Sequence, residues 1–239
     1  MNPSAKIGAF FDLDGTLIAS PSLEWQFIGY LLGRDAMGGG EIFRWLAQCA
    51  KDCLRDPRAA IIGNKQYLAG LRASLADDWA NSLIPCSPRF FPAGLQRVAW
   101  HIAQGHRVFL ISGTLKPLAE IVARRLLGQV EVCATELEVY NGHWTGRLAG
   151  EHMSGEAKAR AIRRIAARFG LALWDSYAYG NSIADLPMLD SVGHRVAVNP
   201  PSRLRRIARS EGWQGCDWAK PAAGATNTGT RQLSPKEAR

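Results

Sequence analysis

The stretch Phe10-Phe11-Asp12-Leu13-Asp14-Gly15-Thr16-Leu17 decides the fold of this 239-residue chain. An apolar run from Ile7 to Phe11, without the alternation of a half-exposed strand, ends abruptly at two carboxylates. Such a run predicts a buried parallel strand that brings Asp12 and Asp14 to its carboxyl end, where open α/β sheets bind ligands. Two carboxylates two residues apart, followed by a glycine that permits a sharp turn, suit a shared magnesium ion. One of them can attack an electrophile while the other handles protons.

Length, apolar pattern and cysteine content narrow the class of protein. The chain is long enough for one α/β domain with an insertion. No apolar run approaches the ~20 residues needed to cross a membrane, and Met1 to Lys6 lack a secretory pattern, so we expect a cytoplasmic protein without a membrane span. The five cysteines form no CxxC pair and are odd in number, which indicates neither a disulfide framework nor a zinc site.

The formal net charge of +8 raises the possibility of a nucleic-acid partner. Part of the excess lies on arginines of one predicted helix, whose opposite face is apolar from Ala161 to Phe169. This amphipathic pattern indicates a solvated polar face, so a nucleic-acid partner is disfavoured. A field of this sign also attracts phosphorylated metabolites. The arginines concerned are Arg160, Arg163, Arg164 and Arg168, and a second group comprises Arg203, Arg205, Arg206 and Arg209.

A long helical segment interrupts the strands. Helix-like periodicity dominates from Leu23 to about Ile84, broken by glycines at 38–40 and by Asp56-Pro57. A connection of this length is a subdomain of its own. We therefore predict an α/β core of residues 1–17 and 91–218 and a helical cap of residues 18–90. Beyond Trp218 apolar periodicity is lost, and a disordered tail is expected over 219–239.

After the insertion, strands alternate with helices, which predicts a Rossmann-like, doubly wound parallel sheet. The predicted strands are 107–111, 130–134, 174–179 and 194–198, with helices over 93–104, from Pro117 to Leu126, and over 155–169. Between them, Asn141-Gly142 is a strong two-residue turn signal, and a β-hairpin is assigned to 136–148.

Polar residues follow several predicted strands, and their chemistry suits a phosphoryl group. Asp12 is the candidate nucleophile, and Asp14 the candidate acid and base. Ser112, with the backbone amides of Gly113 and Thr114 at an expected helix N-terminus, is placed to hold phosphoryl oxygens. Taken alone, Ser-Gly-Thr is also a common turn or helix cap.

The remaining candidates come from the second half of the chain. Lys158, at a helix start, would balance the carboxylates and the negative charge of the transition state. Asn181 and Asp185 would complete a Mg²⁺ site with the Asp12 carboxylate and the Asp14 main-chain carbonyl. A surface charge for Lys158 and a helix N-cap for Asp185 are the structural alternatives. The candidate residues all occur in this order, each just after a predicted strand or at a helix start, and this combination favours a phosphoryl-binding site over the structural alternatives.

Four segments, FDLDGTL, LISGT, GEAK and YGNSIADLPML, resemble the four signatures of the haloacid dehalogenase superfamily, and the helical insertion after the first resembles its phosphoserine phosphatase-like branch. The resemblance implies a Rossmann-like core, a helical cap, Mg²⁺ dependence and hydrolysis of phosphomonoesters. It implies Asp12 as nucleophile, Asp14 as acid and base, Ser112 and Lys158 as phosphate binders and Asp185 at the metal.

One residue departs from the fourth signature, which usually begins Gly-Asp where this chain has Gly180-Asn181. An amide still offers an oxygen to magnesium but carries no charge, so we expect either weaker metal affinity or a larger contribution of Asp185 to metal binding. Three functions stay open: a phosphatase for a small phosphorylated metabolite, a catalytically weak phospholigand-binding or regulatory protein, and a phosphotransferase using the same aspartyl-phosphate intermediate.

The resemblance to the phosphoserine phosphatase-like branch implies that the cap recognises the part of the substrate beyond the phosphate. Glu24, soon after the nucleophile, is a candidate partner for a substrate amino group. Basic residues of the cap are candidates for a carboxylate or second phosphate, and aromatic residues at helical spacing could line a pocket or form core. These are Arg34, Arg44, Arg55 and Arg58, and Trp25, Phe27 and Trp45.

Overall fold

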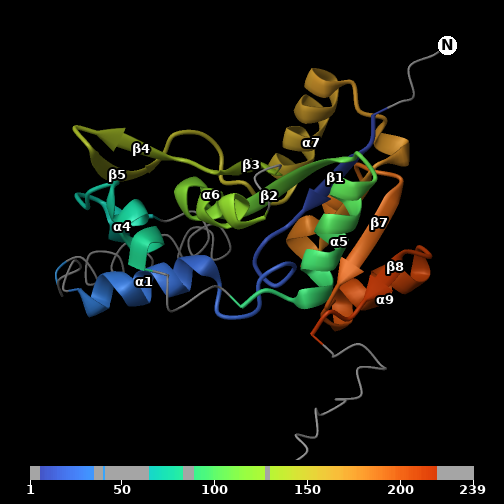
Figure 1. The fold of residues 1–239 in the computed structure, drawn as a ribbon, viewed down its shortest axis with the longest axis horizontal. Coiled ribbons are helices and arrows are strands. Elements are labelled where there is room, and N and C mark those ends of the chain that lie inside the picture. The colour runs from blue at the N-terminus through green and yellow to red at the C-terminus, as the bar shows by residue number, and fades with distance from the viewer. Residues whose placement is uncertain (1–5, 35–39, 41–64, 83–88, 127–129, 220–239) are drawn as a thin grey trace, which may run out of the picture.

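A parallel β-sheet forms the centre of the molecule in a computed structural model, which describes residues 6–34, 40, 65–82, 89–126 and 130–219 (Figure 1). Within these residues its strand order is β3-β2-β1-β6-β7-β8, and every neighbouring pair runs parallel. The strands are β1 (Gly8–Phe11), β2 (Arg107–Leu115), β3 (Val130–Thr135), β6 (Tyr177–Gly180), β7 (His194–Val198) and β8 (Gln214–Cys216). The predicted doubly wound α/β sheet is confirmed.

Helices cover both faces of the sheet, and the side chains of β1, which alternate between the two faces, pack into two separate cores. Ala9 and Phe11 belong to one core with helices α5 (Pro92–Ala103) and α6 (Lys116–Arg125). Phe10 belongs to the other core, with α7 (Glu156–Phe169), α8 (Leu186–Leu189) and α9 (Ser202–Ser210). Buried on both faces, β1 needs the uninterrupted apolar run seen in its sequence.

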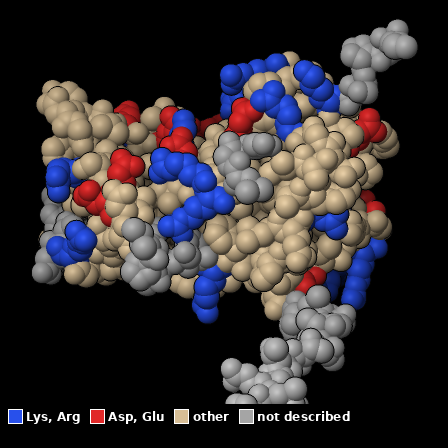
Figure 2. Space-filling view, viewed as in Figure 1, with Lys and Arg blue, Asp and Glu red and all other residues tan. Residues whose placement is uncertain are grey.

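The arginine-rich face of α7 is solvated, as its pattern predicts. Ala161, Ile162 and Ala166 are buried against the sheet, whereas the four arginines are exposed. Figure 2 shows Lys and Arg side chains gathered over this helix, at the upper edge of the view. Arg160 and Arg164 contact Glu151, so the patch is partly neutralised within the chain.

A smaller unit stands beside the main sheet. It contains α1 (Leu23–Gly33), the 3₁₀ turn η1 (Gln66–Leu68), α4 (Leu75–Ser82) and the predicted hairpin, formed by β4 (Leu137–Tyr140) and β5 (His143–Leu148) (Figure 1). Main-chain hydrogen bonds join the hairpin to residues 70–73, including Gly70 N to Trp144 O at 2.8 Å and Trp144 N to Leu71 O at 2.9 Å. The hairpin therefore packs with the inserted segment, although it follows β3 in the chain. The division into core and cap stays a prediction.

The structure differs from the prediction in three places. The strand expected from Trp174 begins at Tyr177, because residues 173–175 form the 3₁₀ turn η2 (Leu173–Asp175), which leaves Trp174 82% exposed. Strand β8 was not predicted, because its three residues, Gln-Gly-Cys, are too short and polar to show a period. Strand β2 runs on through Ser112, Gly113 and Thr114 to Leu115, so these residues end a strand and α6 begins only at Lys116.

Several sequence-based candidates lie outside the described residues: residues 35–39, 41–64 and 83–88 of the cap, the tail beyond Ala219, Arg44, Arg55, Arg58, Trp45, Cys49, Cys53 and Cys86. Cys133 and Cys216 are described, and both are free thiols. Among the described helices none combines the length and apolar character that a membrane crossing requires.

Candidate active site

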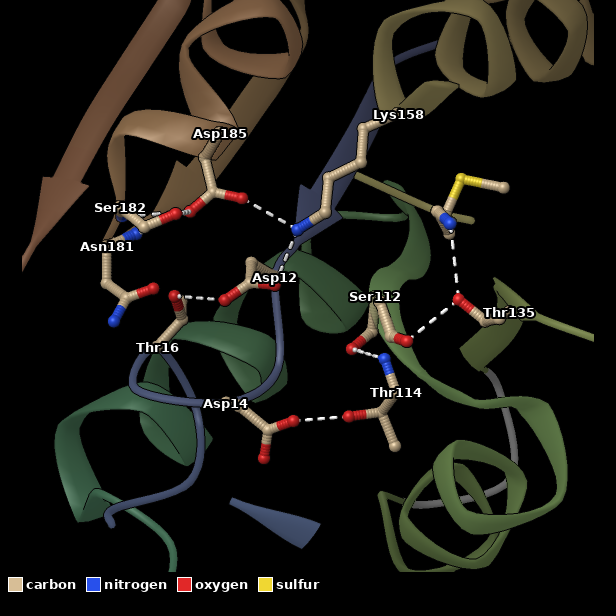
Figure 3. A network of polar contacts seen from close by, with 12 residues as sticks. Asp12, Asp14, Thr16, Ser112, Thr114, Thr135, Lys158, Asn181, Ser182 and Asp185 are labelled. Atoms are coloured by element: carbon tan, nitrogen blue, oxygen red, sulfur yellow. Dashed lines mark hydrogen bonds and ion pairs between the residues drawn. The ribbon is translucent and has the colours of Figure 1, made fainter. Parts of the chain in front are cut away.

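Asp12 is the first residue after β1, and its main-chain N–H still bonds to the Tyr179 carbonyl of β6 at 2.9 Å. The side chain is 9% exposed, and each of its oxygens has a donor. Lys158 Nζ donates to Oδ1 at 2.6 Å, and Thr16 Oγ1 donates to Oδ2 at 2.9 Å. Strand pairing and these two bonds fix the carboxylate at the carboxyl edge of the sheet (Figure 3).

Lys158 joins Asp12 to Asp185. Its ammonium donates to Asp185 Oδ1 at 2.6 Å as well as to Asp12, and its side chain is 4% exposed. The other Asp185 oxygen accepts from Ser182 N at 2.9 Å, Ser182 Oγ at 2.8 Å and Asn181 N at 3.1 Å. Asp185 thus anchors the loop after β6 and holds the lysine. These bonds occupy both of its side-chain oxygens.

The second carboxylate, Asp14, is held away from Lys158 (Figure 3). Its Oδ1 accepts from the main-chain N–H of Leu23 at 2.8 Å, and its Oδ2 accepts from the Thr114 hydroxyl. These bonds connect the loop after β1 to the start of α1 and to the end of β2. Asp14 is therefore hydrogen-bonded both to the inserted segment and to the predicted phosphate-binding residues.

The end of β2 is shaped by its neighbour β3. Leu110 pairs with Phe11, which carries Ser112 to the level of the loop after β1. Ser112 is 1% exposed, and its Oγ accepts from Thr114 N at 3.2 Å. The Thr135 hydroxyl donates to the Gly113 carbonyl at 2.7 Å, and the ladder shifts register between Ser112 and Leu115. The predicted Ser-Gly-Thr group thus lies at the site, but on a strand end and not at a helix N-terminus.

Two glycines allow the site loops to approach each other. Gly15 has a φ of +82°, and an added Cβ would lie 2.0 Å from Asn181 Nδ2. At Gly180, an added Cβ would lie 2.6 Å from the Cβ of Asp185. A side chain at position 15 would separate the loops that follow β1 and β6, and a side chain at position 180 would push Asp185 away from the end of β6.

Three oxygens converge at this junction. The structure places Asn181 Oδ1 3.3 Å from Asp12 Oδ2 and 3.3 Å from the Asp14 main-chain oxygen. Oxygens bound to one Mg²⁺ at ~2.1 Å lie about 3 Å apart, so this oxygen-only group fits such an ion. Among the described residues no group of three or more His, Cys, Asp and Glu is arranged for a metal, because the donors here are one carboxylate, one amide and one carbonyl. The oxygens of Asp185 are bonded to Lys158 and to residues 181–182, and its predicted place at the metal stays a prediction.

Burial and charge act in opposition on the ionisable groups. Burial raises the pKa of Asp12, and Lys158 opposes the rise. Burial also raises the pKa of Asp14, against the bonds from Thr114 and Leu23. Although burial alone would lower it, the pKa of Lys158 is raised by Asp12 and Asp185. Although burial alone would raise it, the pKa of Asp185 is lowered by Lys158 and Ser182. The lysine therefore stays charged and depends on its two carboxylates.

The cap-side candidates have partners within the chain. Glu24 accepts two bonds from Lys65 Nζ, at 2.5 and 2.7 Å, and one from the Tyr67 hydroxyl. Arg34 lies over the ring of Tyr30, 5.0 Å from its centre. Phe27 is fully buried, whereas Trp25 is 60% exposed.

Sequence reasoning missed four residues of the site: Thr16, Lys65, Tyr67 and His152. Thr16 lies inside the quoted stretch, and its hydroxyl four residues after Asp12 was the available signal. Lys65, Tyr67 and His152 follow no strand of the sheet directly and belong to no recognisable spacing. The packing of the inserted segment brings Lys65 and Tyr67 to the site, and the segment between β5 and α7 brings His152 there.

Comparisons with known proteins agree with this geometry. Phosphoserine phosphatase SerB1 of Mycobacterium tuberculosis is 34% identical over 218 residues, which cover 86% of this chain and 69% of that protein. A crystal structure of a Bordetella pertussis protein of unknown function superposes with a TM-score of 0.74 at 28% identity, over 90% of this chain and all of that one. A phospho-aspartyl intermediate analogue of phosphoserine phosphatase shares the fold, with a TM-score of 0.61 at 19% identity over 89% of this chain and 93% of that one.

One protein family matches a range of the chain that includes all the candidate site residues. The profile of the haloacid dehalogenase-like hydrolases aligns with residues 9–190, from β1 through the loop that holds Asn181 and Asp185 to α8. That range includes the residues gathered at the carboxyl edge of the sheet and the inserted segment beside them. The chain therefore belongs to the haloacid dehalogenase-like hydrolase family, and it is a hydrolase whose relatives include a phosphoserine phosphatase.

Proposed function

We propose that this hydrolase is a phosphatase that cleaves the phosphomonoester of a small metabolite through a covalent phosphoryl group on Asp12. One observation carries the proposal: a buried carboxylate at the end of the central strand, bonded to Lys158 and to Thr16, with a second carboxylate two residues on. The matched relative named a phosphoserine phosphatase supports the same reaction class.

In the first step an Asp12 oxygen attacks phosphorus, and the bond between phosphorus and the ester oxygen breaks. Asp14, whose pKa burial raises, donates its proton to the departing alkoxide. Ser112 and the main chain of residues 113–114 lie beside Asp14 and hold phosphoryl oxygens. Lys158 keeps its charge between Asp12 and Asp185 and stabilises the negative charge that builds up at the transition state.

In the second step a water molecule attacks phosphorus of the aspartyl phosphate. Asp14, now a carboxylate, accepts the proton from that water, and the bond between phosphorus and Asp12 breaks. Inorganic phosphate leaves, and both aspartates return to their starting protonation states. Thr114 and Leu23 hold Asp14 in position through both steps.

The oxygens of Asp12, Asp14 and Asn181 would hold a Mg²⁺ ion, as their convergence indicates. The bound ion supplies positive charge that neutralises the phosphoryl group and the nearby carboxylates. Asp185 would contribute through Lys158 and through the loop of residues 181–182, since its own oxygens are bonded there.

Asp12→Asn tests the mechanism. With Mg²⁺ and p-nitrophenyl phosphate, the unchanged protein should release phosphate, and the variant should lose about 10⁴-fold or more in kcat because an amide is not a nucleophile. After acid quenching, a hydroxylamine-sensitive phosphoenzyme should form on the unchanged protein only. Asp175→Asn is the matched control, because Asp175 is exposed before β6. Turnover retained in a folded Asp12→Asn protein would refute the mechanism.

A further inference from the structure

A buried ion pair stands on the cap side of the site. Lys65 and Glu24 are 5% and 19% exposed, and both Glu24 oxygens accept from the lysine. The Tyr67 hydroxyl donates a third bond to Glu24. Both oxygens of the carboxylate are therefore occupied by groups of the chain itself, and the charges of Glu24 and Lys65 balance.

The acidic member of the pair lies close enough to Asp14 to act on its charge, and it raises the pKa of Asp14. Glu24 follows Leu23, the residue whose N–H bonds to Asp14, so α1 carries both an anchor of the loop after β1 and the acidic member of the ion pair. On the opposite side, His152 lies against the predicted phosphate-binding strand end: a Cβ added to Gly113 would be 3.0 Å from His152 Cε1. Burial lowers the pKa of His152 to about 4, and the positive charge of Lys65 adds to this effect. His152 is therefore a neutral hydrogen-bonding group near the pair.

This arrangement is poor for a substrate ammonium. To bind Glu24, the ammonium would displace Lys65 and leave a buried lysine without its counter-charge, which is strongly unfavourable. A hydroxyl meets no such penalty, because it can donate to or accept from the polar groups already present. The charge state of the pair thus separates two kinds of alcohol portion in otherwise similar phosphate esters.

We infer that the pair Glu24–Lys65, with Tyr67, selects phosphate esters that carry a hydroxyl where an amino-acid phosphate carries an ammonium. The inference rests on the proposed phosphatase function and names its substrate class. It places this chain apart from an amino-acid phosphatase, although a relative bears the name phosphoserine phosphatase.

Two substrate pairs test it directly. O-phosphoserine and 3-phosphoglycerate differ at one carbon, as ammonium or hydroxyl, and phosphoethanolamine and 2-hydroxyethyl phosphate differ in the same way without a carboxylate. In both pairs the unchanged protein should favour the hydroxyl compound by about tenfold or more in kcat/KM, because a buried charge is otherwise left unpaired. Equal or better hydrolysis of the ammonium compounds would overturn the inference.

Removing the positive or the negative charge of the pair should change the substrate preference in opposite directions, which a general loss of structure would not do. Lys65→Met frees Glu24 for an ammonium, so the preference for hydroxyl compounds should fall by about tenfold or more. Glu24→Gln leaves Lys65 positive, so the preference should be kept or increased. Lys6→Met, at an exposed position before β1, is the matched control and should leave the ratio unchanged.

The substrate ratio separates this inference from the function on which it rests. p-Nitrophenyl phosphate has neither a hydroxyl nor an ammonium at this place, so its hydrolysis reports the reaction alone. If it is hydrolysed and Lys65→Met leaves the substrate ratio unchanged, the selection by Glu24–Lys65 is refuted and the phosphatase stands. If it is not hydrolysed with Mg²⁺ present, the proposed function itself fails.

Discussion

Asn181 sets the charge balance of the three oxygens that are proposed to hold Mg²⁺. In one orientation its side-chain oxygen joins those of Asp12 and Asp14, and in the flipped orientation its nitrogen donates to the same two oxygens at 3.3 Å. An amide can therefore satisfy the group with an ion or without one. An aspartate at this position would bind the ion more strongly but would repel Asp12 when the ion is absent.

Asn181→Asp should thus separate metal affinity from metal-free stability. We expect the melting temperature in EDTA to fall by about 2–5 °C, since a like charge is added beside Asp12, and the Mg²⁺ concentration for half-maximal stabilisation to fall about tenfold. Thermal melts across a Mg²⁺ titration measure both quantities without relying on activity. Identical melts of the two proteins in EDTA and in Mg²⁺ would contradict this role for Asn181. A sharp rise in turnover in the variant would indicate that the unchanged chain is a weak catalyst.

At the residue scale, the sequence was sufficient to predict that five polar residues meet at one edge of the sheet. Four of them follow predicted strands, and the fifth, Lys158, stands at a helix start; the four are Asp12, Asp14, Ser112 and Asn181. Their detailed contacts were not predictable. The pairing of Asp185 with Lys158, and of Glu24 with Lys65, depends on side-chain packing between segments distant in sequence. Local patterns carry no information about such partners.

At the scale of elements, the hairpin is held by Trp144. This side chain is 3% exposed, and its ring meets Phe27 of α1 edge-on, with centroids 6.1 Å apart. Its main chain bonds to residues 70 and 71. One residue therefore joins the hairpin, α1 and the segment before α4, and with them the helix that carries Glu24.

Trp144→Ala should lower the free energy of unfolding by about 3–5 kcal/mol, because a large buried side chain is lost and a cavity remains. Urea denaturation measures the change. Trp174→Ala is the control, because Trp174 is 82% exposed and its removal should change the unfolding free energy by about 0.5 kcal/mol or less. Equal effects of the two substitutions would mean that the hairpin does not pack on α1 in solution.

The sequence predicted those elements whose conformation is set by neighbouring residues, and it did not predict contacts between segments that are distant in the sequence. Asn141 and Gly142 adopt φ values of 48° and 77°, as a two-residue hairpin turn requires, so the sequence alone located this turn. The packing of the hairpin on residues 70–73 was not predictable, because those residues come from the insertion. Trp174 was placed in a strand on its apolar character, although the chain turns there before β6.

At the scale of the whole molecule, His101 links α5 to the central sheet. It is fully buried, its Nε2 lies 2.8 Å from the Tyr179 hydroxyl of β6, and its Nδ1 lies 2.8 Å from Nδ1 of His106. Tyr179 in turn stacks on Phe11, the residue before Asp12. A change in the charge of His101 would therefore act on the strands that position the nucleophile.

Burial lowers the pKa of His101 to about 3, with His106 and Arg97 adding to the effect, whereas an unfolded histidine titrates near 6.5. Between these values the unfolded chain binds more protons than the folded one, so stability is lost as the pH falls below about 6.5, at up to about 1.4 kcal/mol per pH unit. His101→Gln removes this titration, so its loss of unfolding free energy between pH 7 and pH 5 should be smaller than that of the unchanged protein by about 2 kcal/mol. Urea denaturation at both pH values measures the difference, and exposed His143→Gln should retain the full loss. An identical pH dependence for His101→Gln and the unchanged protein would show that another group unfolds the molecule in acid.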